Sequence, residues 1–139
     1  MSRAESDEAY VIDLCDEILS ERALRQHRFP WLHGDPGRDG RRRTLPIDAY
    51  YPGQGIVVEY RERQHDEPVA FFDRRDTVSG VPRGEQRRRY DLRREAEIPR
   101  RSLRLVVVRP ANLAADRRGR LLRDRVRDRA MLVRLLGAA

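Results

Sequence analysis

The chain has 139 residues and a mass of 16.4 kDa, which corresponds to a single domain with one core. A hydrophobic fraction of 39% and a charged fraction of 38%, with charges of both signs, permit a folded protein and exclude a collagen-like, mucin-like or low-complexity chain. The formal net charge is +7, which favours an anionic partner. All 30 basic residues are arginine, a bias typical of a high-GC genome rather than of selection for guanidinium chemistry.

The N-terminal residues favour a cytoplasmic protein. Residues 1–8 lack the basic region followed by an apolar region that a secretory signal has. No apolar stretch approaches the ~20 residues of a membrane-spanning helix, so no membrane partner is expected. Cys15 has no second cysteine with which to form a disulfide within the chain, which favours a reducing compartment.

Hydrophobic periodicity and turn residues divide the chain into elements. In order, we expect a helix at 7–24, a short edge strand at 29–32, a loop at 34–40, strands at 45–51 and 56–61, a basic helix at 85–97, a buried strand at 103–108 and an amphipathic helix at 116–136. The helix between the hairpin and the last strand allows a parallel crossover, so the sheet should be mixed. The predicted fold is therefore α/β, as one domain over residues 1–139 with its core at about 8–109.

The predicted hairpin brings two carboxylates together. Residues 52–55 have turn chemistry, and a turn centred between Gly53 and Gln54 makes Asp48 and Glu59 direct cross-strand partners, with Cβ atoms ~5 Å apart. Because side chains alternate along a strand, Arg61 shares their face. The opposite face should pack on the core, since it carries mostly apolar residues: Ile47, Ala49, Tyr51, Ile56, Val58 and Tyr60.

This carboxylate pair has two interpretations. Two carboxylates at that distance repel each other unless a cation lies between them, and Mg²⁺ or Mn²⁺ prefers oxygen ligands of this kind. Arg61 would then add a positive charge suited to a phosphate oxygen. The simpler interpretation is a surface salt bridge among Asp48, Glu59 and Arg61.

Two short motifs carry a family resemblance. Pro46-Ile47-Asp48 lies on one predicted strand and Glu59-Tyr60-Arg61 on the next, after a helix that bears acids and before a helix and a strand. This pattern resembles the PD-(D/E)XK nucleases. The segments 57–65 and 90–94 are similar to the small single-domain branch that includes the very-short-patch-repair endonucleases. The likeness covers residues 8–109 or so, and it implies a restriction-endonuclease-like core with the order α-β-β-β-α-β.

The resemblance also implies roles for individual residues. Asp48 and Glu59 would hold the metal ion, with the carbonyl of Tyr60 as a further ligand. The acid of the first helix would be Glu17. The reaction would be metal-dependent hydrolysis of phosphodiester bonds in DNA, with nicking in a repair or defence context.

Arg61 departs from the family pattern, which has lysine at this position. Arginine does not lose its proton at a usable pH, so it cannot activate water as a base. Three alternatives remain open: Arg61 only stabilises charge, Gln64 or His65 positions the attacking water, or activity is weak or lost. His65 fits a general base or phosphate contact as well as it fits a structural position at the strand end.

Two arginine triplets are candidate DNA contacts, because phosphate contacts give affinity without sequence choice. One precedes the Asp48 strand and the other lies on the predicted basic helix: Arg41, Arg42, Arg43, Arg87, Arg88 and Arg89. A metal-dependent DNA endonuclease is the leading hypothesis, and a DNA-binding module on the same fold is the alternative. A protein-interaction domain with an acidic partner is a third. Cutting both strands of a duplex would require two copies, so a homodimer is compatible with the first.

Overall fold

The computed structural model describes residues 6–62 and 83–138, which form an α/β fold. Its elements are α1 (Asp7–Leu19), β1 (Leu24–Pro36), β2 (Arg42–Tyr51), β3 (Ile56–Tyr60), α3 (Arg83–Arg100), β4 (Arg104–Val108), the 3₁₀ turn η3 (Pro110–Asn112) and α4 (Arg125–Leu136). The four strands form a sheet in the order β1-β2-β3-β4. The first three are antiparallel and β4 runs parallel to β3, so the predicted mixed sheet is confirmed.

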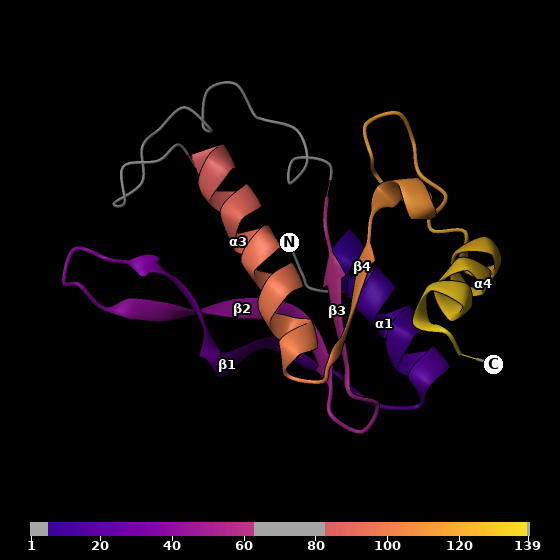
Figure 1. The fold of residues 1–139 in the computed structure, drawn as a ribbon. Helices are drawn as coiled ribbons and strands as arrows, with labels where there is room; N and C mark the ends of the chain where they lie inside the picture. The colour runs from indigo at the N-terminus through magenta and orange to yellow at the C-terminus, as the bar shows by residue number, and fades with distance from the viewer. Residues whose placement is uncertain (1–5, 63–82, 139) are drawn as a thin grey trace.

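Helices cover both faces of the sheet (Figure 1). On one face, α1 and α4 pack on a cluster that includes Ala49, Tyr51, Val58 and Val108. On the other face, Ile98 of α3 packs in a second cluster, which includes Phe29, Leu32, Leu45, Ile47 and Val57. Every residue of β3 is consequently buried. In β4, which was predicted to be buried, only Val106 and Val108 are buried.

Two helix boundaries differ from their predicted positions. Helix α1 ends at Leu19 rather than near residue 24, because Ser20 adopts a left-handed conformation with φ of 52° and its N–H donates to the carbonyl of Asp16. Helix α3 spans more than residues 85–97 and includes Pro99 in its last turn. A proline there removes one helical hydrogen bond only, so the helix continues to Arg100.

The C-terminal helix is shorter than predicted. It begins at Arg125 rather than at residue 116, with the side chain of Asp124 accepting a hydrogen bond from the N–H of Arg127 as an N-cap. The preceding residues form a turn in which Asp116 Oδ1 accepts from the N–H groups of Arg118 and Arg120. Side-chain capping by two aspartates thus replaces the first turns of the expected helix.

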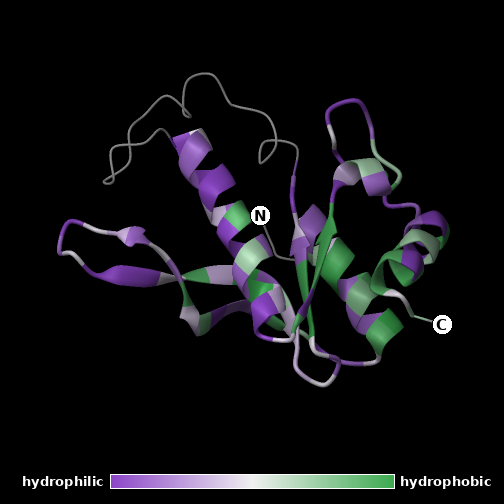
Figure 2. Ribbon diagram, viewed as in Figure 1, coloured by the Kyte–Doolittle hydropathy of each residue, from purple (hydrophilic) through white to green (hydrophobic). Residues whose placement is uncertain are grey.

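Strands β1 and β2 extend beyond the rest of the sheet. The expected edge strand at 29–32 is part of a longer strand, Leu24–Pro36, whose register with β2 shifts after Arg28 and after His33. Strand β2 pairs with β3 over residues 49–51, so its residues 42–47 pair with β1 alone. Residues 28–47 form what we call the β1–β2 ribbon, which leaves the sheet in Figure 1 and is mostly hydrophilic in Figure 2.

Two further properties concern Cys15 and the hydrophobicity of the helices. Cys15 is fully buried, as its position on an apolar helix face predicts, and burial raises the pKa of its thiol to about 12. Within the described residues, no helix is both long and apolar enough to span a bilayer.

A buried carboxyl group joins α4 to α1. Asp128 of α4 has no exposed surface, and its Oδ2 accepts a hydrogen bond of 2.6 Å from the Tyr10 hydroxyl of α1. Its Oδ1 accepts from the N–H of Ala114 at 2.9 Å. Burial and the bond to Asp128 raise the pKa of the Tyr10 hydroxyl, so this group remains a donor.

We predict that Asp128→Ala lowers the free energy of unfolding by about 2–4 kcal/mol, because it leaves two buried donors without an acceptor. Urea denaturation followed by circular dichroism measures the loss. Tyr10→Phe is the matched variant: it removes the hydroxyl but keeps the ring, so its loss should be smaller. An Asp128→Ala variant as stable as the wild type would show that this link contributes nothing.

Candidate active site

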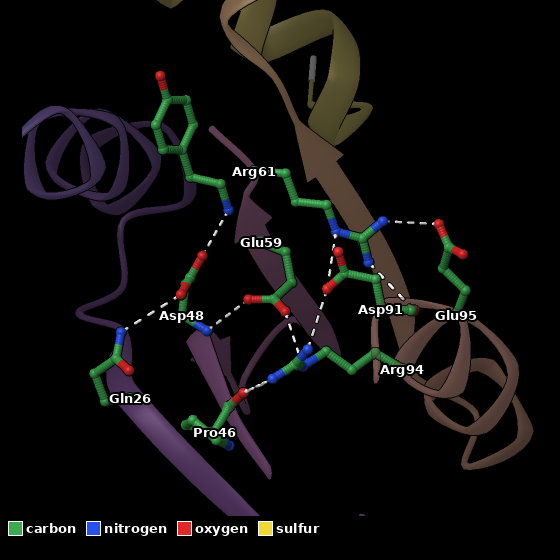
Figure 3. Close-up of polar contacts among 9 residues, drawn as sticks. Gln26, Pro46, Asp48, Glu59, Arg61, Asp91, Arg94 and Glu95 are labelled. Carbon is green, nitrogen blue, oxygen red and sulfur yellow. Dashed lines mark hydrogen bonds and ion pairs between the residues drawn. The ribbon is translucent and has the colours of Figure 1, made fainter. Parts of the chain in front are cut away.

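Asp48 and Glu59 meet across the β2–β3 hairpin. Ala49 pairs with Val58 and Tyr51 with Ile56, and this register places Asp48 opposite Glu59, as predicted from the turn. Beyond these pairs, side chains replace the ladder: the N–H of Asp48 donates to Glu59 Oε2 at 2.9 Å. The N–H of Tyr60 donates to Asp48 Oδ2 at 2.7 Å (Figure 3). The two carboxylates are therefore held by the strands themselves, and Tyr60 reaches Asp48 through its N–H.

One part of the predicted face assignment is wrong. Ile47 does not share a cluster with Ala49 and Tyr51 but packs with Val57 on the α3 side of the sheet. The physical reason is that the β2–β3 ladder ends at Ala49, after which β2 diverges into the ribbon. Burial still alternates along β2, where residues 45, 47, 49 and 51 are buried, so the divergence of the strand from β3, and not a break in the alternation, brings Ile47 to the α3 side.

The face that carries Glu59 and Arg61 is covered, whereas we expected it to be open. Helix α3 lies over this face, and Glu59 is only 5% exposed and Arg61 only 3%. A surface salt bridge among Asp48, Glu59 and Arg61 is therefore excluded as a description of this site. A buried charge needs an opposite charge or several hydrogen bonds, and α3 supplies both.

Arg94 of α3 is the cation beside Glu59. Its Nε lies 3.1 Å from Glu59 Oε1, and its Nη2 donates to the carbonyl of Pro46 at 2.9 Å. Its Nη1 donates to Asp91 Oδ1 at 3.1 Å. Arg94 lies within the segment 90–94 that carries part of the family resemblance, but nothing in the sequence pattern assigns it a role. The spacing of Asp91, Arg94 and Glu95 on one helix face is the signal that marks this group of charges.

Arg61 faces away from Asp48 (Figure 3). Its Nη1 lies 2.9 Å from Glu95 Oε1, and its Nη2 donates to the carbonyl of Asp91 at 3.4 Å. Its Nε lies 3.7 Å from Asp91 Oδ1. The guanidinium group is thus paired with α3, and it is Arg94 that occupies the position next to the carboxylates.

The carboxylate of α1 that reaches this site is that of Glu8, and Glu17 lies elsewhere. Glu8 and Asp48 accept hydrogen bonds from the same Gln26 amide, at 3.1 and 3.4 Å, whereas Glu17 forms an exposed ion pair with Arg125 at 2.8 Å. Glu17 lies about two and a half helical turns further along α1 and therefore points to the opposite side of the helix. Residue type alone could not separate the acids of this helix, because the direction in which the helix crosses the sheet decides which one reaches Asp48.

Gln26, on the neighbouring strand β1, bridges the carboxylates of Glu8 and Asp48. Arg25 pairs with Ala49 and His27 with Ile47, so Gln26 lies opposite Asp48. Its Nε2 donates to Glu8 Oε2 at 3.1 Å and to Asp48 Oδ1 at 3.4 Å. Its φ of 51° is left-handed, a conformation that costs a non-glycine residue about 1 kcal/mol or more. This backbone conformation accompanies an amide that points at the carboxylates of Glu8 and Asp48.

Burial and mutual repulsion perturb this acidic group. Burial, and next the charge of Asp48, raise the pKa of Glu59 from 4.5 to about 8. The same two causes, in the same order, raise the pKa of Glu8 from 4.5 to about 7. Arg94 opposes the change at Glu59 without cancelling it. Near neutral pH, Glu8 and Glu59 therefore retain part of their protons unless a further cation joins the group.

The donor chemistry of these three residues fits a hard divalent cation, since all their ligand atoms would be carboxylate oxygens. The geometry would have to adjust. Over the part of the chain that the structure describes, no three Asp, Glu, His or Cys side chains are already arranged to hold a metal ion. Oxygens of Glu8, Asp48 and Glu59 instead accept hydrogen bonds from Gln26 and from backbone N–H groups.

The remaining predicted residues lie in three places. Arg41, Arg42 and Arg43 are exposed on the ribbon, and Arg87, Arg88 and Arg89 lie on the N-terminal half of α3, where Arg89 pairs with Glu85 at 3.1 Å. Gln64 and His65 lie outside the described residues.

Comparisons with protein-family models, curated proteins and solved structures found no match. The function is therefore inferred from the residues themselves.

We predict that the free energy of unfolding falls as pH rises from 6 to 8. The pKa of Glu59 is higher in the folded state than in the unfolded state, so the folded protein binds more protons in this window and loses stability as they leave. Glu59→Gln should make the free energy of unfolding depend less on pH. A single titrating group can change this free energy by at most about 1.4 kcal/mol per pH unit. Urea denaturation at several pH values measures it.

Glu17→Gln is the control for that comparison, because it removes a carboxylate from an exposed ion pair outside the acidic group. It should keep the wild-type slope between pH 6 and 8. The same slope in Glu59→Gln as in the wild type would contradict the assignment of the titrating group.

Proposed function

We propose that this protein is a metal-dependent endonuclease of the PD-(D/E)XK type that hydrolyses phosphodiester bonds in DNA. The observation that carries the proposal is the convergence of Glu8, Asp48 and Glu59 at the end of the β2–β3 ladder. Gln26 Nε2 donates to both Glu8 and Asp48, and the N–H of Asp48 donates to Glu59. The order of elements, helix, three strands, helix and strand, supports a restriction-endonuclease-like core.

In this proposal, Glu8, Asp48 and Glu59 would hold Mg²⁺ or Mn²⁺. Such an ion, when bound, polarises the phosphoryl oxygen and lowers the pKa of water. Arg94 fixes the rotamer of Glu59 through its bonds to Glu59 and Pro46, so the carboxylate is oriented before any ligand arrives. Gln26 holds Glu8 and Asp48 together in the same way.

The residues around this centre divide the remaining work. Arg61 acts as a structural cation that anchors α3 through Glu95, rather than as the charge that faces the phosphate. Gln64 and His65 keep the proposed role of positioning the attacking water. Arg41–Arg43 and Arg87–Arg89 are proposed to contact DNA phosphates, in keeping with the net charge of +7.

A DNA-binding module without catalysis is the second candidate. The pairing of Glu59 with Arg94 favours it, because that pairing partly neutralises the carboxylate in the absence of any metal ion. The two candidates differ in one observable: an enzyme breaks the DNA backbone when a divalent cation is supplied, and a binding module shifts DNA in a gel without breaking it.

We predict that the wild-type protein nicks supercoiled plasmid in Mg²⁺ or Mn²⁺ and not in EDTA. Asp48→Ala and Glu59→Gln should lower the rate by at least about a hundredfold, because each removes a ligand of the proposed ion. Conversion of supercoiled to open-circular DNA, followed on agarose gels, measures the rate.

Glu8→Gln and Glu17→Gln form the matched pair for the acid of α1. Both substitutions are isosteric and lie on one helix, but only Glu8 reaches Asp48. Glu8→Gln should therefore reduce nicking strongly, and Glu17→Gln should leave it near the wild-type rate. Equal rates in these two variants would contradict the assignment of Glu8, and a wild-type protein that binds DNA without nicking it would support the binding module.

A further inference from the structure

The β1–β2 ribbon, residues 28–47, is not needed to complete the sheet. Its strands pair with each other at Arg28 and Pro46, at His33 and Thr44, and at Pro36 and Arg42, while β3 pairs with β2 only from Ala49 onward. It projects from the side of the molecule opposite α4 (Figure 1). A two-stranded ribbon is marginal by itself, so its position depends on what else it packs against.

Helix α3 holds the ribbon in place. The N–H of Asp35 donates to the Tyr90 hydroxyl at 2.8 Å, and Arg93 Nη1 donates to the carbonyl of His33 at 2.9 Å. Arg93 Nη2 lies 3.2 Å from Asp35 Oδ1. A Cβ atom at Gly34 would come within 2.9 Å of the Tyr90 hydroxyl, so the backbone and the helix are in close contact. The ribbon is thus a fixed arm.

The outer surface of this arm is strongly basic. Its exposed side chains include those of Arg38, Arg41, Arg42 and Arg43, and none of these four guanidinium groups pairs with a carboxylate of the residues that the structure describes. The two acids of the arm are already engaged: Asp35 pairs with Arg93, and Asp39 Oδ1 accepts a hydrogen bond from the N–H of Arg41. The positive charge at the tip is therefore available to an external anion.

The width of the β1–β2 ribbon determines which groove of duplex DNA it fits. Paired strands lie about 4.8 Å apart, and with side chains they fill the major groove of B-form DNA, which is about 12 Å wide, but not the minor groove of about 6 Å. Arg42 precedes Asp48 by six residues of strand β2. This corresponds to about 20 Å of extended chain, or to about six base pairs at 3.4 Å each.

We propose that the β1–β2 ribbon enters the major groove of duplex DNA and contacts it about six base pairs from the phosphate nearest Asp48. The inference rests on the proposed function insofar as DNA is the ligand, but it does not require catalysis. It adds that the substrate is a duplex rather than a single strand, and it makes one arm of the protein the element that fixes its distance from the cleavage position.

Binding in EDTA tests this inference without cleavage. A fluorescent duplex of about two helical turns and its single strand are titrated with wild-type protein and with the triple variant Arg38→Ala, Arg41→Ala, Arg42→Ala. The variant should bind the duplex at least about tenfold more weakly, and the slope of log K against log salt should fall by about 2–3, because three phosphate contacts are lost. Its affinity for the single strand should change less.

The matched control removes the same charge from α4. Arg127, Arg129 and Arg134 are exposed on that helix, on the other side of the molecule from the ribbon. Their triple alanine variant should bind the duplex within about twofold of the wild type. Equal losses in the two triple variants, no loss in either, or an equal loss on single-stranded DNA would each overturn the inference, as would a wild-type protein that does not bind duplex DNA.

Methylation interference then tests the groove. Modification of guanine N7, in the major groove, should weaken binding, and interference confined to adenine N3, in the minor groove, would overturn the placement. These experiments distinguish the failure of the ribbon inference from the failure of the proposed function. If the wild type nicks DNA and the ribbon variant binds duplex as well as the wild type does, only the ribbon inference is wrong. If binding depends on the ribbon but the wild type does not nick DNA, only the nuclease activity is wrong.

Discussion

The burial of Glu59 between the sheet and α3 is the constraint on which the site depends. A carboxylate in the central strand of a sheet loses its hydration, and it is retained only if the surrounding elements supply hydrogen bonds and charge. The N–H of Asp48 and the guanidinium of Arg94 do so. Because these partners come from β2 and α3, the position of one side chain joins three elements.

The charges on α3 follow from the same constraint. Arg94 satisfies Glu59 and the carbonyl of Pro46, and it also bonds to Asp91. Arg61, buried one position beyond Tyr60, pairs with Glu95 and lies near Asp91. This alternation of opposite charges lets a highly charged helix cover an otherwise buried strand. It also leaves the carboxylates of Glu8 and Asp48 at the edge of the network, on the side away from α3.

Sequence patterns were sufficient for the hairpin and insufficient for its surroundings. The turn at 52–55 and the alternation of side chains specify the register, so the contact between Asp48 and Glu59 was predictable. These are local constraints, and they act within a few residues of each other.

The partners contributed by helices could not be predicted in the same way. Glu8 rather than Glu17 reaches Asp48 because of the angle at which α1 crosses the sheet, and Arg94 rather than Arg61 reaches Glu59 because α3 covers that face. Gln26 reaches the site with a left-handed φ, a conformation that the sequence does not mark with a glycine. Tertiary packing decides all three, and no periodicity in the chain encodes it.

The central claim is that Glu8, Asp48 and Glu59 form one cation site, and titration with Mn²⁺ in the absence of DNA tests it most directly. Calorimetry near pH 7, in buffers of different ionisation enthalpy, reports both the ion bound and the protons released. The proposed site predicts one Mn²⁺ per chain with release of protons, and loss of that binding in Asp48→Asn and Glu59→Gln. The claim is contradicted if the wild-type protein does not bind Mn²⁺, or if both variants bind it as the wild type does.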